Sequence, residues 1–418
     1  MVRATDGGRI PDLANADWLT RPATRDVLKA LTAEGAEARA VGGAVRNALM
    51  GTPVKDVDLA TTALPEDVMR LAQKAGLHAV ATGIEHGTVT VVSQHTPFEV
   101  TTLRRDIETF GRHARVTFTT DWAEDARRRD FTMNALYCDA DGTVHDPLNG
   151  FEDLLARRVR FIGDARARIR EDYLRSLRFF RFLAEYGDAT APDPDGLAAT
   201  IAEKDGLSGL SSERIRVEML RLLGAPGARD ALRTMEQAGL LQPLLGVVPD
   251  LARLDRLAAV EAHLGRHADP VLRLAALALG GSDPATLQER LRLSGAETAR
   301  LRNAAARDEA FAPDADQQTA KEFIYRNGPE AYLDGALMSW VRDGAGAGDA
   351  RRTALVRLAE TWQAPDCPVR GTDVLARGIA PGPDVGRVIA AFEAWWIGED
   401  FPVDEARIAA KLDELTRT

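Results

Sequence analysis

The stretch from Val41 to Asp58, VGGAVRNALMGTPVKDVD, most strongly constrains how this chain can fold. Gly42 and Gly43 end an apolar run, and because glycine lacks a Cβ atom the backbone there can turn tightly and approach a ligand closely. Residues 44–50 have helix-forming composition, and Gly51 follows where a left-handed C-terminal cap is expected. The stretch therefore predicts a strand, a glycine turn, a short helix and a second strand.

Two features of this stretch favour binding of a phosphorylated ligand. A helix N-terminus behind a glycine turn presents free N–H groups and a positive dipole end, which suits a phosphate. The second strand, predicted over Val54–Thr61, places Asp56 and Asp58 on one face, since side chains two residues apart on a strand point the same way. Two close carboxylates repel each other unless a cation lies between them. Together with Arg46 and Lys55, the pattern predicts a site for a magnesium-bound triphosphate.

Each half of this pattern has an ordinary alternative. A Gly-Gly pair before a helix is often only a turn, and an Asp-x-Asp pair often lies on a solvated surface. The hypothesis of a triphosphate site depends on the two halves occurring together in one short stretch.

Composition limits the class of protein and its partners. The chain has 418 residues, of which 45% are hydrophobic and 28% are charged, so we expect a soluble, globular protein of two to four domains. No apolar run approaches the ~20 residues of a membrane helix, and the N-terminus has no apolar signal core. The two cysteines, Cys138 and Cys367, exclude a disulfide framework or a zinc cluster and fit a cytoplasmic location. The net charge of −10 means that an RNA partner needs a local basic surface.

The segments on either side of the glycine stretch predict an α/β domain. Two helices are expected, at Thr24–Ala33 and Pro65–Ala75, and a turn is expected at Thr96-Pro97. A hairpin is expected from Leu136–Asp139 and Thr143–His145. The other β-like runs are Leu77–Val80, Thr88–Val92 and Phe98–Leu103. This alternation predicts a small mixed sheet with flanking helices.

The pattern Gly-Gly-x-Val-Arg, Leu-x-Gly and Asp-x-Asp resembles the nucleotidyltransferase motif of bacterial-type (class II) tRNA nucleotidyltransferases, the CCA-adding enzymes, and of bacterial poly(A) polymerases. These enzymes belong to the DNA polymerase β superfamily. The resemblance implies an α/β N-terminal head with a mixed sheet of that superfamily's type, followed by an all-α neck, body and tail. Family members usually have Asp after the motif arginine, whereas this chain has Asn47, which is no proposed metal ligand.

Glu99 is a candidate third carboxylate. Because it lies on the opposite strand face from Phe98 and Val100, a solvated strand residue is the alternative. The segment HGTVTVV…FEVTTLRRD resembles the part of CCA-adding enzymes in which an acidic residue stands at this place. It does not resemble the Gly-Arg-Arg-Phe type sequence of poly(A) polymerases. The resemblance implies that Glu99 acts in catalysis with Asp56 and Asp58.

Arg104–Asp121 mixes charge, Gly111 and aromatic residues without a sustained period. We expect a flexible loop that leaves the sheet, with an edge strand at Val116–Thr120 as the alternative. Long irregular loops inside compact domains are often functional. In the resembling family a mobile loop at this place is needed for the final adenosine addition.

The run ARRRDFTMNA resembles a second motif of the family. Arg128–Ala135 fits a helix with Asp130 and Asn134 on one face, four residues apart. The alternative is a charged helix end with a packed Phe131. The resemblance implies that Arg129, Asp130 and Asn134 bind nucleotide.

Arginines recur in a segment predicted as one long helix, Ile169–Glu185. Arg175, Arg178 and Arg181 repeat every three residues, which is also the pattern of a solvated charged face. Within this segment, Glu-Asp-x-x-Arg resembles a fourth family motif. Its Asp172 and Arg175 are three residues apart and would be neighbours on a helix.

Asp172 and Arg175 offer complementary hydrogen-bonding groups, because a carboxylate only accepts hydrogen bonds and a guanidinium only donates them. Cytosine and adenine both present an amino group beside a ring acceptor, which matches such a pair. Uracil and guanine present a carbonyl oxygen where the amino group should be. We therefore predict that these two residues select the base, with an ordinary surface ion pair as the alternative.

The resemblance continues along the chain. Glu213-Arg-Ile-Arg-Val-Glu-Met-Leu resembles a fifth motif that braces the helical region, and residues 370–386 resemble the family's tail. The domain boundaries that we expect are a head at 1–145, a neck with the nucleotide-selecting helix at 146–205, a body at 206–280 and a tail that contacts tRNA at 281–418.

The resemblance implies template-independent addition of CCA to the 3′ end of tRNA from CTP and ATP, with release of pyrophosphate and no membrane partner. Two Mg²⁺ ions would bridge Asp56, Asp58 and the triphosphate.

The alternatives are a bacterial poly(A) polymerase, a CC-only or A-only enzyme, and a catalytically silent RNA-binding protein, which would be expected to lack the Asp pair. The candidate nucleotide-binding residues are Gly42, Gly43, Arg46, Arg129, Asp130, Asn134, Asp172, Arg175 and Arg178.

Overall fold

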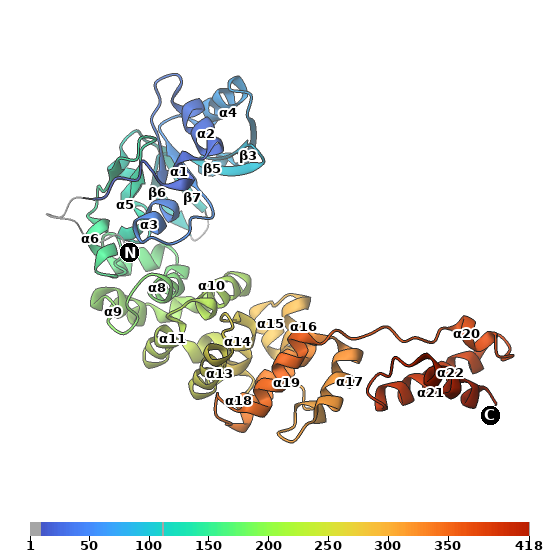
Figure 1. Cartoon of the computed structure of the whole chain (residues 1–418). Helices are drawn as coiled ribbons and strands as arrows, with labels where there is room; N and C mark the ends of the chain where they lie inside the picture. Colours follow the sequence, from blue (N-terminus) through green and yellow to red (C-terminus); the bar gives the residue numbers. More distant parts are fainter. Residues whose placement is uncertain (1–9, 111–112, 418) are drawn as a thin grey trace. The chain divides into compact units, whose positions relative to one another are not determined.

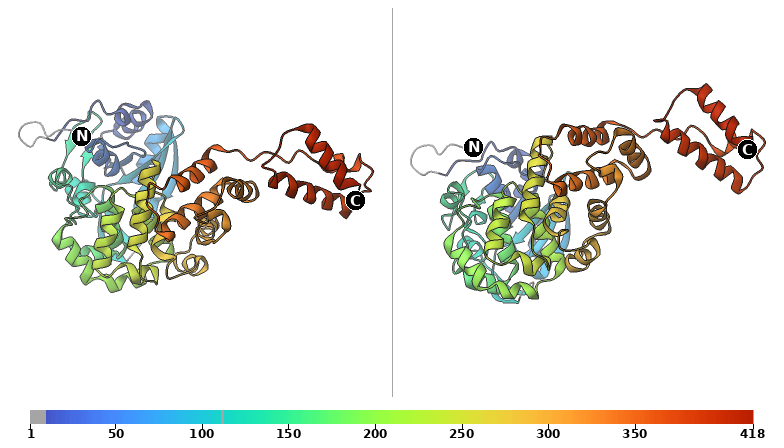
Figure 2. Two further views of the ribbon diagram at one scale, coloured as in Figure 1. Left: turned by 60° about the horizontal axis from the view of Figure 1, so that its bottom comes forward. Right: turned by 90° about the horizontal axis from the view of Figure 1, so that it is seen from below.

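The computed structural model describes residues 10–110 and 113–417 and divides the chain into two compact units. The first unit ends at Gly246 and the second begins at Val247. In the first unit an α/β part (blue to cyan) is followed along the chain by helices only (Figure 1). Figure 2 shows the same succession of elements from two other sides. An α/β head followed by helices confirms the predicted fold class, while the finer four-part division stays a prediction.

A seven-stranded mixed sheet forms the centre of the α/β part, in the order β3-β4-β5-β2-β1-β8-β9. Strands β2 and β5 are parallel, and all other neighbours are antiparallel. Helices α2 (Pro22–Thr32) and α4 (Pro65–Lys74) flank the sheet, as predicted. The strands are β1 (Ala38–Val41), β2 (Asp58–Thr61), β3 (His78–Gly83), β4 (Thr88–Ser93), β5 (Thr96–Thr102), β8 (Tyr137–Cys138) and β9 (Val144–His145).

The turn between β4 and β5 lies two residues earlier than predicted. Gln94 and His95 form it with positive φ angles of 49° and 62°, and Thr96 already pairs with Ser93. Two central residues in the left-handed region match the twist of a tight hairpin, which explains how residues other than glycine turn the chain here. The predicted turn at Thr96-Pro97 is therefore wrong by two residues, although both strands are present.

The segment predicted as a flexible loop is a two-stranded antiparallel sheet of β6 (Arg104–Phe110) and β7 (His113–Phe118). Only the alternative of an edge strand near Val116 pointed to this pairing. The register shifts between Asp106 and Glu108. Such a bulge moves the following residues to the other face of the strand, so the sequence shows no clean alternation. Residues 111–112 lie outside the described ranges.

The helices predicted at the second and fourth motifs differ in the structure. In place of a helix over Arg128–Ala135, helix α5 (Trp122–Arg127) ends and a short 3₁₀ turn, η2 (Thr132–Asn134), follows. The guanidinium of Arg168 donates hydrogen bonds to the backbone carbonyls of Arg128 and Arg129, and the Asp130 carboxylate accepts one from the Phe131 N–H at 2.8 Å. These bonds replace the ones that a continuing helix would need.

The predicted long helix over Ile169–Glu185 is broken at Asp172. Helix α7 (Ala165–Glu171) ends there, with Asp172 in an extended conformation (φ −155°, ψ 105°), and α8 (Leu174–Glu185) begins two residues later. The Asp172 carboxylate accepts a hydrogen bond from the N–H of Leu174 at 3.2 Å. Short polar side chains that bond to nearby backbone in this way compete with helix formation.

The remaining elements are helical. The first unit adds α6 (Gly150–Leu155), α9 (Pro194–Ala202), η3 (Lys204–Gly209), α10 (Ser212–Gly224), α11 (Ala228–Gln237) and α12 (Leu241–Leu245). The second unit contains α13 (Leu251–Leu264), α14 (Pro270–Ala278), α15 (Pro284–Leu291), α16 (Gly295–Ala305), α17 (Gln317–Asn327), α18 (Pro329–Asp343), α19 (Ala350–Thr361), α20 (Gly371–Leu375), α21 (Pro383–Gly398) and α22 (Glu405–Thr416). Among residues 10–110 and 113–417, no helix is both long enough and apolar enough to cross a membrane.

An aromatic cluster joins the α/β part of the first unit to its helices. Phe131 is fully buried, and its ring centroid lies 4.9 Å from those of Phe161 and Phe182 and 6.4 Å from that of Phe179. Phe161 and Phe179 stack on each other at 5.5 Å. Because Phe179 and Phe182 belong to α8, this cluster fixes α8 against the chain that follows α5.

We expect Phe131→Ala to lower the free energy of unfolding of the first unit by about 3–5 kcal/mol, because it leaves a cavity inside this cluster. Phe131→Leu keeps most of the volume and should cost less than about 1.5 kcal/mol. Urea unfolding of the two variants beside the wild type measures both values. Equal, small losses in both variants would contradict a joining role for the cluster.

Candidate active site

The glycine turn has the conformation that the sequence predicts. Gly42 precedes α3 (Gly43–Leu49) with φ 68° and ψ −116°, a combination that is costly for any residue with a Cβ atom. Its N–H donates to the carbonyl of Leu136 at 3.1 Å, which ties the turn to the neighbouring strand β8. Gly51 has φ 68° just after the helix, as expected of a left-handed cap.

The three candidate carboxylates lie near one another where the central strands β2 and β5 pair. Asp58 is the first residue of β2, whereas Asp56 precedes the strand, so the predicted strand start at Val54 is wrong. The parallel register pairs Leu59 with Val100, which makes Asp58 and Glu99 neighbours on the same face of the sheet. Partial burial raises the pKa of the Asp58 carboxyl, and Glu99 and Asp56 raise it further, while Arg129 opposes them.

This group of carboxylates fits a divalent cation that arrives with a phosphorylated ligand. In the part of the chain that the structure describes, no group of three or more His, Cys, Asp or Glu side chains forms a complete metal site. Mg²⁺, however, is usually bound by one or two carboxylates together with substrate phosphates. A cation beside Asp58 would also relieve the repulsion that raises the pKa of this residue.

A cleft of about 600 Å³ opens beside Asp58 and brings all nine predicted nucleotide-binding residues together. Asp56 and Glu99 are not among its lining residues. The cleft is lined by Gly42, Gly43, Arg46, Asp58, Arg129, Asp130, Asn134, Asp172, Leu174, Arg175, Arg178, Arg181, Phe182, Tyr186, Arg214 and Arg221. Residues that are far apart in the sequence therefore share one wall, as a binding site requires.

Arg129 is held in the cleft by a buried acid. Its guanidinium donates to Asp125 at 3.0 Å and to the Tyr137 hydroxyl at 3.2 Å, and that hydroxyl donates to Asp125 at 2.8 Å. Burial alone would raise the pKa of Asp125, but Arg129 and Arg128 outweigh it and lower the pKa to about 2. The same contacts raise the pKa of Arg129, so both groups stay charged near neutral pH.

Asp130 connects the second motif to α8. One carboxylate oxygen accepts from the Asn134 amide at 2.8 Å, and the other accepts from Arg178 at 2.9 Å. Burial opposes ionisation, but the Arg178 charge and these hydrogen bonds lower the pKa of Asp130 to about 2. Asn134 in turn accepts a hydrogen bond from Arg46. Asp130 and Asn134 are thus linked as predicted, although no helix carries them.

The predicted base-selecting pair lines the cleft, but its two members are held by other partners. Asp172 accepts a hydrogen bond from Arg214 at 2.6 Å. Arg175 donates to the Arg168 carbonyl at 2.8 Å and to the carboxylate of Glu171. The helix break at Asp172 means that the two residues are not on one helix, which corrects the prediction. They remain adjacent, since the Arg175 N–H donates to the Asp172 carbonyl at 3.0 Å.

The sequence-based candidates omitted several residues of the cleft. Arg181 had a signal, because it continues the three-residue repeat of Arg175 and Arg178. Arg214 lies in the fifth motif, which was interpreted as a brace. That bracing is real, because Glu218 of α10 accepts from Arg181 at 2.5 Å and lies 3.7 Å from Arg178. The other omitted residues are Leu174, Phe182, Tyr186 and Arg221.

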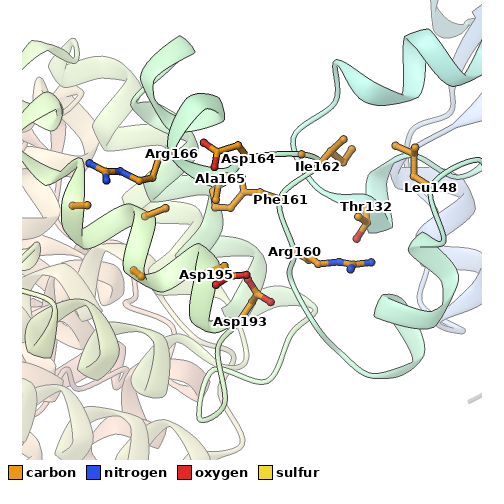
Figure 3. A pocket seen from close by; sticks show the side chains of 14 residues that line it. Thr132, Leu148, Arg160, Phe161, Ile162, Asp164, Ala165, Arg166, Asp193 and Asp195 are labelled. Carbon is orange, nitrogen blue, oxygen red and sulfur yellow. The ribbon is translucent and has the colours of Figure 1, made fainter.

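A larger pocket of about 880 Å³ lies elsewhere in the first unit, between the segment 160–166 and α9. Figure 3 shows Asp193 and Asp195 on one side of it and Arg160 and Thr132 on the other. Two of its charged groups have protein partners, since Arg160 donates to Asp153 at 2.8 Å and Asp193 caps α9. None of the predicted site residues lines this pocket, so the smaller cleft is the candidate active site.

The chain is similar to known proteins over most of its length. Residues 38–160 match the family model "Poly A polymerase head domain", and residues 191–254 match the model "Probable RNA and SrmB-binding site of polymerase A". The chain is 34% identical to CCA tRNA nucleotidyltransferase 1, mitochondrial, of Danio rerio, over 91% of this chain and 86% of that protein. It is 31% identical to the CCA-adding enzyme of Levilactobacillus brevis, over 93% and 97%.

A solved structure shows the same likeness in three dimensions. The crystal structure of Bacillus stearothermophilus CCA-adding enzyme in complex with CTP superimposes with a TM-score of 0.70 and 30% identity. The superposition covers 95% of this chain and 98% of that one. The similarity therefore extends over both compact units and is not confined to the α/β part.

The depressed pKa of Asp125 predicts how stability depends on pH. Because its folded pKa, about 2, is below the ordinary value of 3.8, the charged carboxylate stabilises the fold above about pH 4, and this stabilisation is lost as pH falls toward 2. Asp125→Asn should therefore cost roughly 2 kcal/mol at pH 7 and about half of that at pH 3. Chemical denaturation at the two pH values measures the difference, and a cost that does not change with pH would contradict it.

Proposed function

The chain belongs to the family of CCA-adding tRNA nucleotidyltransferases, and from this premise we propose that it adds CCA to the 3′ end of tRNA without a nucleic-acid template, using CTP and ATP and releasing pyrophosphate. One observation carries the proposal. Nine residues chosen from three separate sequence motifs line a single cleft together with Asp58, and the seven arginines of the lining outnumber its three aspartates, which suits an anionic nucleotide. The enzyme is a nucleotidyltransferase.

We infer that Asp56 and Asp58 would hold two Mg²⁺ ions. When bound, such ions would neutralise the charge of the triphosphate and lower the pKa of the primer 3′-hydroxyl. The residues of the chain do the positioning. The glycine turn lets the backbone approach the phosphates, and Arg129, fixed by Asp125, presents a cation to them. Glu99 lies beside Asp58, where it helps to hold the reacting hydroxyl and accept its proton.

Asp172 and Arg175 select the base. Asp172 accepts the amino group of cytosine or adenine, and Arg175 donates to the adjacent ring acceptor. The bond from Arg214 fixes the Asp172 carboxylate, and Glu171 fixes the Arg175 guanidinium, so the pair is already oriented before a nucleotide enters. A base with a carbonyl in place of the amino group leaves a buried carboxylate facing an acceptor, which is strongly unfavourable.

The alternatives are less well supported. The relatives that span nearly the whole chain are CCA-adding enzymes, although the head also matches a poly(A) polymerase model. The β6–β7 hairpin occupies the place of the loop that adenosine addition requires in the family, which favours full CCA addition over CC-only addition. The tRNA partner and a cytoplasmic location belong to the same proposal.

We expect Asp58→Ala, and equally Asp56→Ala, to lower nucleotide addition by at least about 10³-fold, because metal ions contribute several kcal/mol of charge stabilisation in the transition state. tRNA binding and the thermal unfolding temperature should change little. Asp67→Ala is the matched control and should retain full activity, because Asp67 lies on α4 outside the cleft and pairs with Arg70 at the protein surface. Normal turnover in either cleft variant would exclude the two-metal assignment.

The proposed base selection predicts a change in nucleotide preference. Asp172→Ala should reduce discrimination of CTP against UTP by about 10²-fold or more, because the variant no longer has a carboxylate facing the wrong carbonyl. Arg175→Ala should mainly weaken nucleotide binding. Single-nucleotide incorporation with each of the four triphosphates measures both effects. If Asp172→Ala kept the wild-type ranking, Asp172 and Arg214 would form only a structural ion pair.

A further inference from the structure

Six of the seven arginines that line the cleft are already engaged by protein acceptors. Arg129 and Arg181 bond to the buried acids Asp125 and Glu218, and Arg178 bonds to the half-buried Asp130. The others bond to a different set of partners: Arg46 to Asn134, Arg175 to Glu171, and Arg214 to Asp172. These guanidinium groups have carboxylate or amide partners that fix them and, in most cases, balance their charge.

Arg221 is the exception. It is exposed and lines the cleft, and within residues 10–110 and 113–417 no protein group is hydrogen-bonded or ion-paired to its side chain. Arg214, Glu218 and Arg221 are spaced i, i+4 and i+7 on α10, so they share one helix face. The carboxylate of Glu218 is engaged by Arg181. The positive charge of Arg221 is therefore available to an anion that enters the cleft.

Tyr186 is the second group of the cleft without a function in the proposed chemistry. It follows the last residue of α8, is half-buried, and lines the cleft. The guanidinium of Arg46 covers its ring at 3.8 Å from the centroid. Arg46 is itself fixed by Asn134, so it supports the ring as a fixed platform.

Arg221 and Tyr186 lie toward the same end of the cleft. Helices α8 and α10 run in the same direction, since Arg214 bonds to Asp172 near the start of α8 and Glu218 bonds to Arg181 farther along. Arg221 is one turn beyond Glu218, which places it level with the end of α8, where Tyr186 stands. This end lies away from the base-selecting residues Asp172 and Arg175.

We propose that Arg221 and Tyr186 form the subsite for the single-stranded 3′ end of the RNA primer, in which Arg221 pairs with a backbone phosphate and the Tyr186 ring stacks on a base. The inference rests on the proposed function. The incoming nucleotide is held by Asp172 and Arg175 at its base and by the glycine turn at its phosphates. The primer must enter the same cleft, because its 3′-hydroxyl has to reach the α-phosphate beside Asp58.

The chemistry of the two side chains suits this ligand. Stacking on an aromatic ring and pairing of an arginine with a phosphate bind single-stranded RNA without regard to sequence, since every base has a π-face and every nucleotide a phosphate. The last base of the primer changes after each of the successive additions. A subsite that ignores base identity can hold all of these primers, whereas a hydrogen-bonded pocket would hold only one.

The test uses the full chain and an acceptor-stem RNA minihelix that ends where CCA addition starts. We expect Arg221→Ala and Tyr186→Leu each to raise the Michaelis constant for this primer by about 5- to 100-fold, the range for lost stacking or phosphate contacts. The Michaelis constant for CTP should stay within about twofold. Arg221→Ala should also reduce the slope of log affinity against log salt by about 0.7. Arg25→Ala, an exposed arginine outside the cleft, and Tyr186→Phe, which keeps the ring, are the controls.

Two results would overturn the proposal, and two further results would leave the decision to a second measurement. A raised Michaelis constant for CTP with an unchanged one for the primer would assign Arg221 to the triphosphate. No change in either would make Arg221 a solvated surface cation. If the wild-type chain added no nucleotide, the proposed function would fail, but direct binding of the minihelix to wild type and Arg221→Ala would still decide the subsite. If Tyr186→Leu unfolds on thermal analysis, the exposed Arg221 variant decides alone.

Discussion

The cleft depends on the half-buried ion pair between Asp130 and Arg178. Asp130 lies in the α/β part, between α5 and β8, and Arg178 belongs to α8, so their contact at 2.9 Å joins two walls of the cleft. Both carboxylate oxygens are used, one by Arg178 and the other by the Phe131 N–H and the Asn134 amide. Replacing such a pair by apolar residues often costs little stability, but removing one partner leaves an uncompensated buried charge. We therefore regard Asp130 as a residue that organises the site.

The remaining contacts extend this arrangement in both directions. Asn134 accepts a hydrogen bond from Arg46, whose guanidinium lies over the Tyr186 ring. Glu218 of α10 contacts Arg178 and Arg181, which connects α10 to α8. Arg168 closes the network from α7 by bonding the carbonyls of Arg128 and Arg129. Phe182, which packs on Phe131 in the aromatic cluster, also lines the cleft. A preorganised, positively charged cleft results, in which few groups need to move when a nucleotide binds.

Much of the fold and site could be predicted from the sequence, because the decisive signals are local. Gly42 and Gly51 have the backbone angles that their positions demanded, and β1, β4 and β5 follow their apolar patterns. The errors arose where tertiary hydrogen bonds override local propensity, as at Asp172, which breaks a helix that its neighbours favour. Arg214 and Arg221 were missed because their places in the cleft depend on how α10 packs against α8, and no local pattern records that packing. Asp56 and Asp58 were proposed from their spacing on a predicted strand, although only Asp58 lies on β2.

The central claim is that this cleft builds one defined sequence without a template. The most direct measurement is incubation of the full chain with tRNA lacking its 3′ end, with CTP alone, ATP alone and both together, followed by sequencing of the products. We predict two cytidines with CTP alone, little addition with ATP alone, and CCA with both, after which extension stops. Runs of adenosine would contradict this claim and indicate a poly(A) polymerase, and products ending at CC in the presence of both nucleotides would indicate a CC-only enzyme.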